Sequence, residues 1–313
     1  MHQPKKLKVI SVNISEKKGT IKHPVDKIEI DHKGIINDAH AGAWHRQVSL
    51  LEKESIDRFS KEAGRTINYG EFAENITASG LEHINVTVFD RLKIGGVELE
   101  VTQIGKKCHG NACAIFREVG KCVMPKEGIF CRVITTGTIK PGDMINHQPK
   151  ILKILVITLS DRASKGEYED KSGPKIIELT GNYFKTTDMK CHIDSEIIPD
   201  DASILKSVLQ KAKKEHIDFI FTTGGTGIGP RDITPDVVRP MLDKEIPGIM
   251  EMIRYKFGQE KPNALLSRGV AGIMGETLVY TLPGSVRAVE EYTGEIFKTL
   301  QHLIYMQHGL DIH

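Results

Sequence analysis

The chain has 313 residues, which indicates two domains at roughly 100 to 200 residues each. It is 39% hydrophobic and 27% charged, with 43 basic and 41 acidic side chains. This composition excludes a disordered chain and a polycation built around nucleic acid. No apolar run typical of a signal peptide begins the chain, and the most apolar stretch, 151–159, is short of the roughly 20 residues that span a bilayer. We expect a cytoplasmic protein with no nucleic-acid or membrane partner.

The first half alternates apolar and polar residues in short β-branched runs separated by turn residues, a pattern typical of half-buried strands. Gly95-Gly96 predicts a two-residue hairpin turn, and one helix is expected just before Gly64, which would end it. The half is predicted to be a β-rich barrel or sandwich. The expected strands lie within residues 8–15, 27–31, 47–52, 91–104 and 128–145.

After the polar stretch 146–150 the sequence alternates strands and helices, which favours a largely parallel sheet covered on both faces. We place the domain boundary near residue 149, giving domains 1–148 and 149–313. The expected strands are 153–159, 191–198, 218–223 and 278–282, and the expected helices are 172–180, 202–214, 235–242, 248–257 and about 286–306.

The five cysteines include no C-x-x-C pair, so a disulfide framework and a four-thiolate zinc site are poorly supported. Cys108 follows a strand, with two lysines before it and a histidine after it, surroundings that lower a thiol pKa and suit a nucleophile or sulfur carrier. Cys131 lies in an alternating strand and is expected to be packed. His40 and His45 have no clear third metal ligand, which favours hydrogen-bonding roles over a metal site.

In the second half, small, hydroxyl and acidic residues follow each parallel strand. Ligands of doubly wound sheets bind beyond the carboxyl ends of the strands, so these residues are candidates for one site. The segments are Ser160-Asp161, Pro199-Asp200-Asp201, Gly224 to Asp232, and Pro283-Gly284-Ser285.

The glycine-rich segment Gly224-Gly225-Thr226-Gly227 predicts a phosphate site, because glycines let backbone N–H groups approach an anion. Thr234-Pro235 is expected to cap and begin a helix behind it. The segment is neither a P-loop, since Pro230-Arg231 replaces its Lys-Ser/Thr, nor a dinucleotide fingerprint.

Carboxylates beside a phosphate site suit Mg²⁺, and Asp200 and Asp232 are the candidate ligands. The alternatives are an N-cap for Asp200 and a turn for Asp232. Capping or turn roles are also open for Asp161 and Ser285.

Together, T-T-G-G-T-G-x-G-P-R-D-x-T-P-D (222–236), L-S-D-R-A-S-x-G, I-P-D and L-P-G-S resemble the molybdopterin adenylyltransferases. The resemblance covers about residues 151–310. It implies transfer of an adenylyl group from ATP to molybdopterin with Mg²⁺, without pyridoxal phosphate, in a homo-oligomer that is a trimer in the family. The resemblance implies that the family's two essential aspartates correspond to Asp200 and Asp232. It carries the pterin and nucleotide contacts onto Ser160, Asp161, Gly224, Gly225, Thr226, Gly227 and Ser285.

In the first half, R-Q-V-S-L-L, F-x-E-N-I, V-T-Q-I-x-K-x-C-H and M-P-K-E-G-I-F-x-R-V resemble the MOSC domain over residues 6–147. The resemblance implies a β-barrel in which Cys108 carries sulfur or ligates the molybdenum cofactor, and Arg46 and Arg132 bind the cofactor's phosphate. Asn37 replaces a family glycine, and we expect it to adopt a left-handed conformation.

The two resemblances together predict a two-domain enzyme of molybdenum cofactor biosynthesis, with Asp200, Asp232 and Cys108 as its catalytic residues. Other proteins of the pathway are possible partners. The alternative is a non-catalytic carrier or scaffold that binds molybdopterin or the finished cofactor. The presence of both Asp200 and Asp232 favours the enzyme.

Overall fold

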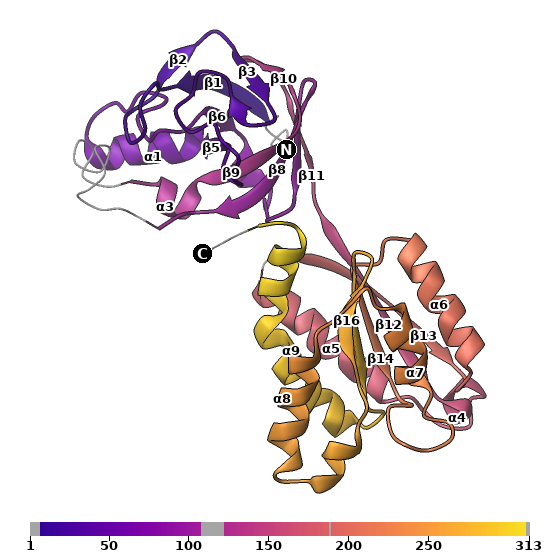
Figure 1. The fold of residues 1–313 in the computed structure, drawn as a ribbon. Helices are drawn as coiled ribbons and strands as arrows, with labels where there is room; N and C mark the ends of the chain where they lie inside the picture. The colour runs from indigo at the N-terminus through magenta and orange to yellow at the C-terminus, as the bar shows by residue number, and fades with distance from the viewer. Residues whose placement is uncertain (1–6, 108–121, 188, 311–313) are drawn as a thin grey trace. The chain divides into compact units, whose positions relative to one another are not determined.

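The computed structural model describes residues 7–107, 122–187 and 189–310. The chain forms two compact units, Met1–Lys150 and Ile151–His313. The first consists mainly of strands, and the second alternates strands with helices (Figure 1). Within the described residues, no helix combines the length and the apolar character that crossing a membrane requires.

The N-terminal unit contains an eight-stranded and a three-stranded sheet. In spatial order the larger sheet comprises β11 (Ile145–Gln148), β7 (Arg91–Ile94), β8 (Val97–Ile104), β9 (Ile129–Thr135), β5 (Val48–Glu52), β6 (Ile76–Ser79), β1 (Lys8–Ile14) and β2 (His23–Val25). The smaller comprises β10 (Gly137–Ile139), β3 (Ile28–Asp31) and β4 (Gly34–Ile35). Their apolar side chains form one core. The β-rich architecture is confirmed, while closure into a barrel stays a prediction.

Local signals in this unit are confirmed. Helix α1 (Lys53–Ala63) ends at Gly64, whose φ is 65°. Strands β7 and β8 form a hairpin in which Ile94 pairs with Val97 across the two glycines. Asn37 has a left-handed φ of 67°. The short helices are η1 (Leu81–His83) and α3 (Met124–Glu127).

The C-terminal unit is built on a six-stranded sheet whose first four strands are parallel. In spatial order its strands are β13 (Lys190–Ile198), β12 (Ile151–Leu159), β14 (Phe219–Thr223), β17 (Thr277–Leu282), β16 (Ala271–Met274) and β15 (Lys244–Glu245). The last two are antiparallel additions that the sequence patterns did not predict, since they are four and two residues long.

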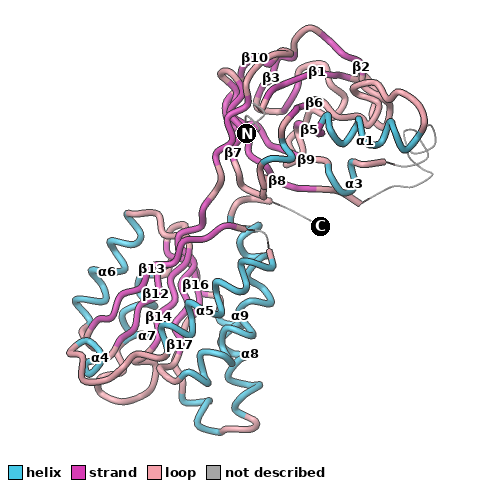
Figure 2. Tube along the Cα trace, turned by 180° about the vertical axis from the view of Figure 1, so that it is seen from behind, coloured by secondary structure: helices cyan, strands magenta, loops and turns pink. Residues whose placement is uncertain are grey.

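Helices cover both faces of this sheet, as predicted (Figures 1 and 2). Ile220 of β14 belongs to the core beneath α6 and α7, whereas its neighbours Phe219 and Phe221 contact aromatic rings of α5 and α9. This alternation is the two-residue period of a strand buried on both faces. The helices are α4 (Asp161–Ser164), α5 (Ser172–Thr186), α6 (Ala202–Lys214), α7 (Thr234–Val238), η3 (Arg239–Met241), α8 (Pro247–Gly258), η4 (Pro262–Leu266) and α9 (Val286–Gln307).

Candidate anion and carboxylate site

The carboxyl ends of four parallel strands lie at one edge of the C-terminal sheet. Leu159 of β12 pairs with Ile198 of β13, and Thr223 of β14 pairs with Leu282 of β17. Strands β12 and β14 are themselves neighbours. The four segments that follow these residues therefore begin at the same rim.

The turn after β14 requires glycine at its first two positions. Gly224 has a φ of 101°, and a Cβ added there would overlap the carbonyl oxygen of Leu159. Gly225 has a φ of 62°, and its Cβ would lie 2.7 Å from Oγ1 of Thr234. Residues with side chains rarely adopt these angles, so the sharp turn depends on both glycines.

The loop that follows presents unpaired backbone donors. Within the described residues, no hydrogen bond is formed by the N–H groups of Gly225, Thr226, Gly227 and Ile228. The next donor, Gly229 N–H, bonds Oδ2 of Asp232 at 2.7 Å. A run of free N–H groups at strand ends is a binding surface for an anion such as phosphate.

Thr234 was expected to be an N-cap, and this prediction is wrong. Ile233 occupies the N-cap position of α7, while the Thr234 hydroxyl donates to Gly224 O at 2.9 Å. The tight turn brings that carbonyl within reach, which redirects the hydroxyl. Because α7 has five residues, the anion site rests on loop N–H groups and not on a helix end.

Asp161 and Asp200 are joined by reciprocal hydrogen bonds. Asp161 N–H donates to Asp200 Oδ2 at 3.2 Å, and Asp200 N–H donates to Asp161 Oδ1 at 3.0 Å. The N-cap of α6 is the next residue, Asp201, which accepts from Ser203 and Ile204 at 2.8 and 3.0 Å. The capping alternative for Asp200 therefore does not hold.

The surrounding charges shift the pKa values of Asp161 and Asp200 in opposite directions. The Asp200 N–H and the Arg231 guanidinium, 2.8 Å from Asp161 Oδ2, hold the pKa of Asp161 below its usual value. Burial raises the pKa of Asp200, and the carboxylates of Asp161 and Asp232 raise it further. A cation beside Asp200 would favour its ionised form.

The two candidate serines have local structural roles. Ser160 Oγ accepts from Ala163 N–H at 3.2 Å and caps α4, and Ser285 Oγ accepts from Ala288 N–H at 3.3 Å and caps α9. Among the described residues, no group of three or more His, Cys, Asp or Glu side chains could hold a metal ion. Any Mg²⁺ here would need oxygen ligands from a substrate, as is usual for this ion.

A pocket of ≈ 550 Å³ adjoins the glycine loop. Gly225 to Ile228, Asp232 and Ser285 line it. The lining also contains Glu291, which bonds both Lys261 Nζ (2.5 Å) and Arg287 Nε (3.0 Å). Sequence reasoning missed these three charged residues, because they lie beyond the segments that directly follow the parallel strands. Its further lining residues include Asn263, Ser267 and Tyr292.

In the N-terminal unit, Cys108 lies outside the described residues. Arg46 stacks on Trp44, with Cζ 4.8 Å from the ring centroid. Its Nε is buried and has no hydrogen-bond partner among the residues that the structure describes. Arg132 instead pairs with Glu100 at 2.5 Å. Arg46 therefore has the freer guanidinium of the two.

A buried charge pair supports the segment that carries His40. The side chains of Lys22 and Asp38 are each 1% exposed and bond one another. Lys22 Nζ also lies 3.3 Å from His40 Nδ1. Burial alone would raise the pKa of Asp38, but hydrogen bonds from His40 and Lys22 hold it well below its usual range. His40 thus has the hydrogen-bonding role predicted for it.

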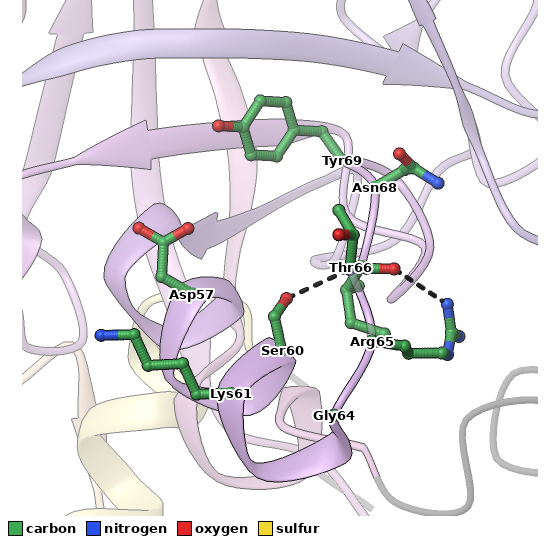
Figure 3. Close-up of a pocket in the computed structure, with 9 residues that line it drawn as sticks. Asp57, Ser60, Lys61, Gly64, Arg65, Thr66, Asn68 and Tyr69 are labelled. Carbon is green, nitrogen blue, oxygen red and sulfur yellow. Dashed lines mark hydrogen bonds between the residues drawn. The ribbon is translucent and has the colours of Figure 1, made fainter.

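Cys131 and a pocket beside α1 are two further features of the N-terminal unit. Cys131 is fully buried, as expected, and burial raises its pKa. A pocket of ≈ 790 Å³ lies at the end of α1 (Figure 3). Two of its charged residues are already paired, Arg65 with Glu71 and Asp57 with Lys53.

The fold and the strand-end site define an α/β protein with a glycine loop whose N–H groups lack acceptors among the described residues, beside two hydrogen-bonded aspartates. Residues 155–302 match the family described as a probable molybdopterin binding domain, and residues 37–146 match the MOSC domain. The chain belongs to the molybdopterin-binding domain family through its C-terminal unit and carries a MOSC domain in its N-terminal unit.

Relatives match the C-terminal half. A molybdopterin adenylyltransferase from Pyrococcus furiosus is 42% identical over 163 residues, 49% of this chain and 92% of that protein. The molybdenum cofactor synthesis protein cinnamon of Drosophila melanogaster is 38% identical over 48% of this chain, which spans 25% of that protein's length. A solved tungsten cofactor synthesizing protein from P. furiosus is 38% identical, with 51% and 98% coverage and a TM-score of 0.45.

Proposed function

We propose that the C-terminal unit is a molybdopterin adenylyltransferase that acts in molybdenum cofactor biosynthesis. The observation that carries the proposal is the run of free N–H groups from Gly225 to Ile228, placed at the strand ends that also supply Asp161 and Asp200. The match to the Pyrococcus enzyme over 92% of its length supports it.

The reaction needs positioning more than a protein nucleophile. The terminal phosphate oxygen of molybdopterin attacks the α-phosphorus of ATP, the bond to the β-phosphate oxygen breaks, and pyrophosphate leaves. The loop N–H groups would hold phosphate oxygens and stabilise the charge that develops on them. Alignment of the two phosphates supplies the rest of the rate enhancement.

The carboxylates fit a divalent cation. Burial raises the pKa of Asp200, and repulsion from Asp161 and Asp232 raises it further, which a bound cation would relieve. Asp200 and Asp232 would hold Mg²⁺ together with phosphate oxygens of ATP. When bound, the ion neutralises charge on the triphosphate.

The ≈ 550 Å³ pocket is the proposed pterin site. Its volume is within the usual range for a small-molecule ligand, and it begins at the glycine loop. Ser285 lines it directly, whereas Ser160 lies at the end of β12. Ser285 would orient the pterin, and Ser160 and Asp161 the substrate at the neighbouring strand end.

The test is incubation with molybdopterin, ATP and Mg²⁺ while pyrophosphate and adenylyl-molybdopterin are monitored. The wild-type chain should release pyrophosphate only when molybdopterin is present, and Asp232→Asn should release far less. A carrier or scaffold would bind molybdopterin without consuming ATP. That result would refute the enzyme and leave the alternative standing.

For the N-terminal unit we propose cofactor binding or sulfur carrying by Cys108, with Arg46 and Arg132 contacting the cofactor's phosphate. The buried, unpartnered Nε of Arg46 among the described residues supports an anion nearby. Cys108→Ala should abolish cofactor or persulfide loading, and Cys191→Ser in the other unit should not. Normal loading of Cys108→Ala would overturn the proposal.

We further propose that residues 1–148 and 149–313 are the two domains and that the first is a closed barrel. Bonds from Ile145 N–H to Leu7 O (3.0 Å) and from Val9 N–H to Asp143 O (2.9 Å) support closure.

For the second domain a homo-trimer is proposed. Exposed apolar side chains on α8 and η4, among them Met252, Tyr255 and Leu265, suit an interface between copies. Sedimentation of the full chain tests the assembly.

A further inference from the structure

Arg268 contacts the glycine loop although it lies far from it in the sequence. It follows η4 and precedes β16. Its backbone N–H donates to Thr226 O at 2.8 Å, and its Nε donates to Gly227 O at 2.7 Å. Its Nη2 donates to Asp232 O at 2.5 Å. One residue therefore binds carbonyls at both ends of the segment 226–232.

These bonds fix which way the loop's peptide groups point. A carbonyl that faces a phosphate repels it, so an anion-binding loop must direct its carbonyls elsewhere. Arg268 donates hydrogen bonds to the carbonyls of Thr226, Gly227 and Asp232 and so directs them toward itself. The N–H groups of 225–228 remain without acceptors in the described residues. The bonds from Arg268 and the unpaired N–H groups therefore both follow from one orientation of the loop's peptide groups.

The guanidinium is itself anchored. Its Nη1 lies 2.8 and 3.0 Å from the two carboxylate oxygens of Asp236. All three of its nitrogens thus have acceptors within the protein, which leaves the group poorly placed to bind substrate phosphate directly. Asp236 lies on α7, so the pair also ties the loop to the helix that follows it.

We propose that Arg268 is a positioning residue that holds the glycine loop in its anion-binding conformation, with Asp236 as its anchor. The inference rests on the proposed adenylyltransferase function for its kinetic consequence. The conformational consequence, a loop that loosens without Arg268, can be measured whether or not that function is correct.

The decisive variant is Arg268→Lys, which keeps the charge and loses the planar fork that bonds Gly227 and Asp232 together. The expected kcat for adenylyl transfer falls roughly 10- to 100-fold, the loss expected for one or two charge-assisted hydrogen bonds. KM for molybdopterin should rise as well, because Gly225 to Ile228 and Asp232 line the proposed pterin pocket. Amide hydrogen exchange at Gly229, Asp232 and Ile233, whose N–H groups are hydrogen-bonded within the loop, should accelerate while exchange in β14 and β17 stays slow.

Arg239→Lys is the matched control. Arg239 is also paired with a carboxylate, Glu245, at 3.3 Å, but makes no bond to the loop. It should leave kcat and loop exchange unchanged. Asp236→Asn keeps Arg268 and removes its anchor, so its effects should have the same direction as those of Arg268→Lys and be smaller.

Three results would overturn the inference. The first is unchanged exchange at Gly229, Asp232 and Ile233 in Arg268→Lys, whatever happens to kcat. The second is unchanged kcat together with faster exchange. The third is equally faster exchange throughout the C-terminal unit, since that would indicate a general structural role. A wild-type chain that transfers no adenylyl group refutes the proposed function instead. The exchange data then still test whether Arg268 holds the loop.

Discussion

Two polar clusters, one in each unit, differ in whether their groups are paired within the fold. At the strand ends of the C-terminal unit, four N–H groups lack acceptors within the described residues, and Asp200 lies near two other carboxylates. In the N-terminal unit, Lys22 and Asp38 bond one another with side chains 1% exposed. The first cluster keeps backbone donors unpaired among the described residues, and the second encloses a charge pair within the fold.

The difference predicts different consequences of substitution. Removing one member of an enclosed pair leaves a buried charge without a partner, which lowers the free energy of unfolding. Removing a carboxylate from an open, crowded site relieves repulsion and should mainly lower activity. The following substitutions test this contrast.

The largest effect on stability is expected for Lys22→Met. It leaves Asp38 buried without its cation, and we expect a loss of about 3–5 kcal/mol in the N-terminal unit. Urea unfolding followed by fluorescence measures this, because the chain's one tryptophan, Trp44, lies in that unit. The double variant Lys22→Met with Asp38→Leu should recover part of the loss. A single variant within about 1 kcal/mol of wild type would show that the pair is not enclosed.

Asp200→Asn should lower kcat for adenylyl transfer about 100- to 1000-fold, the range for losing one group that stabilises charge in a transition state. Asp201→Asn is the matched control, since asparagine is also a preferred N-cap residue. Its pyrophosphate release should equal that of wild type. Equal losses in the two variants would assign the effect to the structure of the 199–201 segment.

Gly224→Ala tests the turn on which the open site depends. The positive φ and the overlap with Leu159 O predict a loss of about 2–3 kcal/mol in unfolding free energy. Gly166→Ala, at a φ of 74° with nothing within 4 Å, should cost about 1 kcal/mol. Circular dichroism during urea unfolding compares them. Similar losses would show that the overlap relaxes at little cost.

The sequence predicted the features that depend on short stretches of chain. The strand-end segments were found because parallel strands bring consecutive strand ends to one rim, and α6 was predicted with its observed bounds, Ala202–Lys214. Such reasoning could not tell which of the neighbouring residues Asp200 and Asp201 caps α6. Edge strand β15 was missed because two residues are too few to show the alternation of apolar and polar side chains that predicts a strand.

Features built from distant residues were not predictable in the same way. Arg268 lies 41 residues from Gly227, and Lys22 lies 16 residues from Asp38. Nothing in the local pattern around either cation distinguishes it from the other basic residues of the chain. The fold gives them their partners, by bringing residue 268 to the glycine loop and residue 22 to residue 38.

The smallest expected effect is on Tm, which substitutions of the neighbouring residues Asp200 and Asp201 by asparagine should shift in opposite directions at pH 7. The pKa of Asp200 is raised in the folded state, first by burial and then by Asp161 and Asp232, so its ionisation at neutral pH opposes folding. Asp200→Asn should therefore raise Tm slightly at pH 7, and the gain should vanish as pH falls through the raised pKa. Hydrogen bonds from Ser203 and Ile204 lower the pKa of Asp201, so its ionised form stabilises the fold. Asp201→Asn should lower Tm slightly at pH 7, with the loss disappearing in acid. Thermal scans of both variants between pH 7 and about pH 3 measure these shifts. Shifts in the same direction at pH 7 would mean that the open and capping roles of this pair have been assigned wrongly.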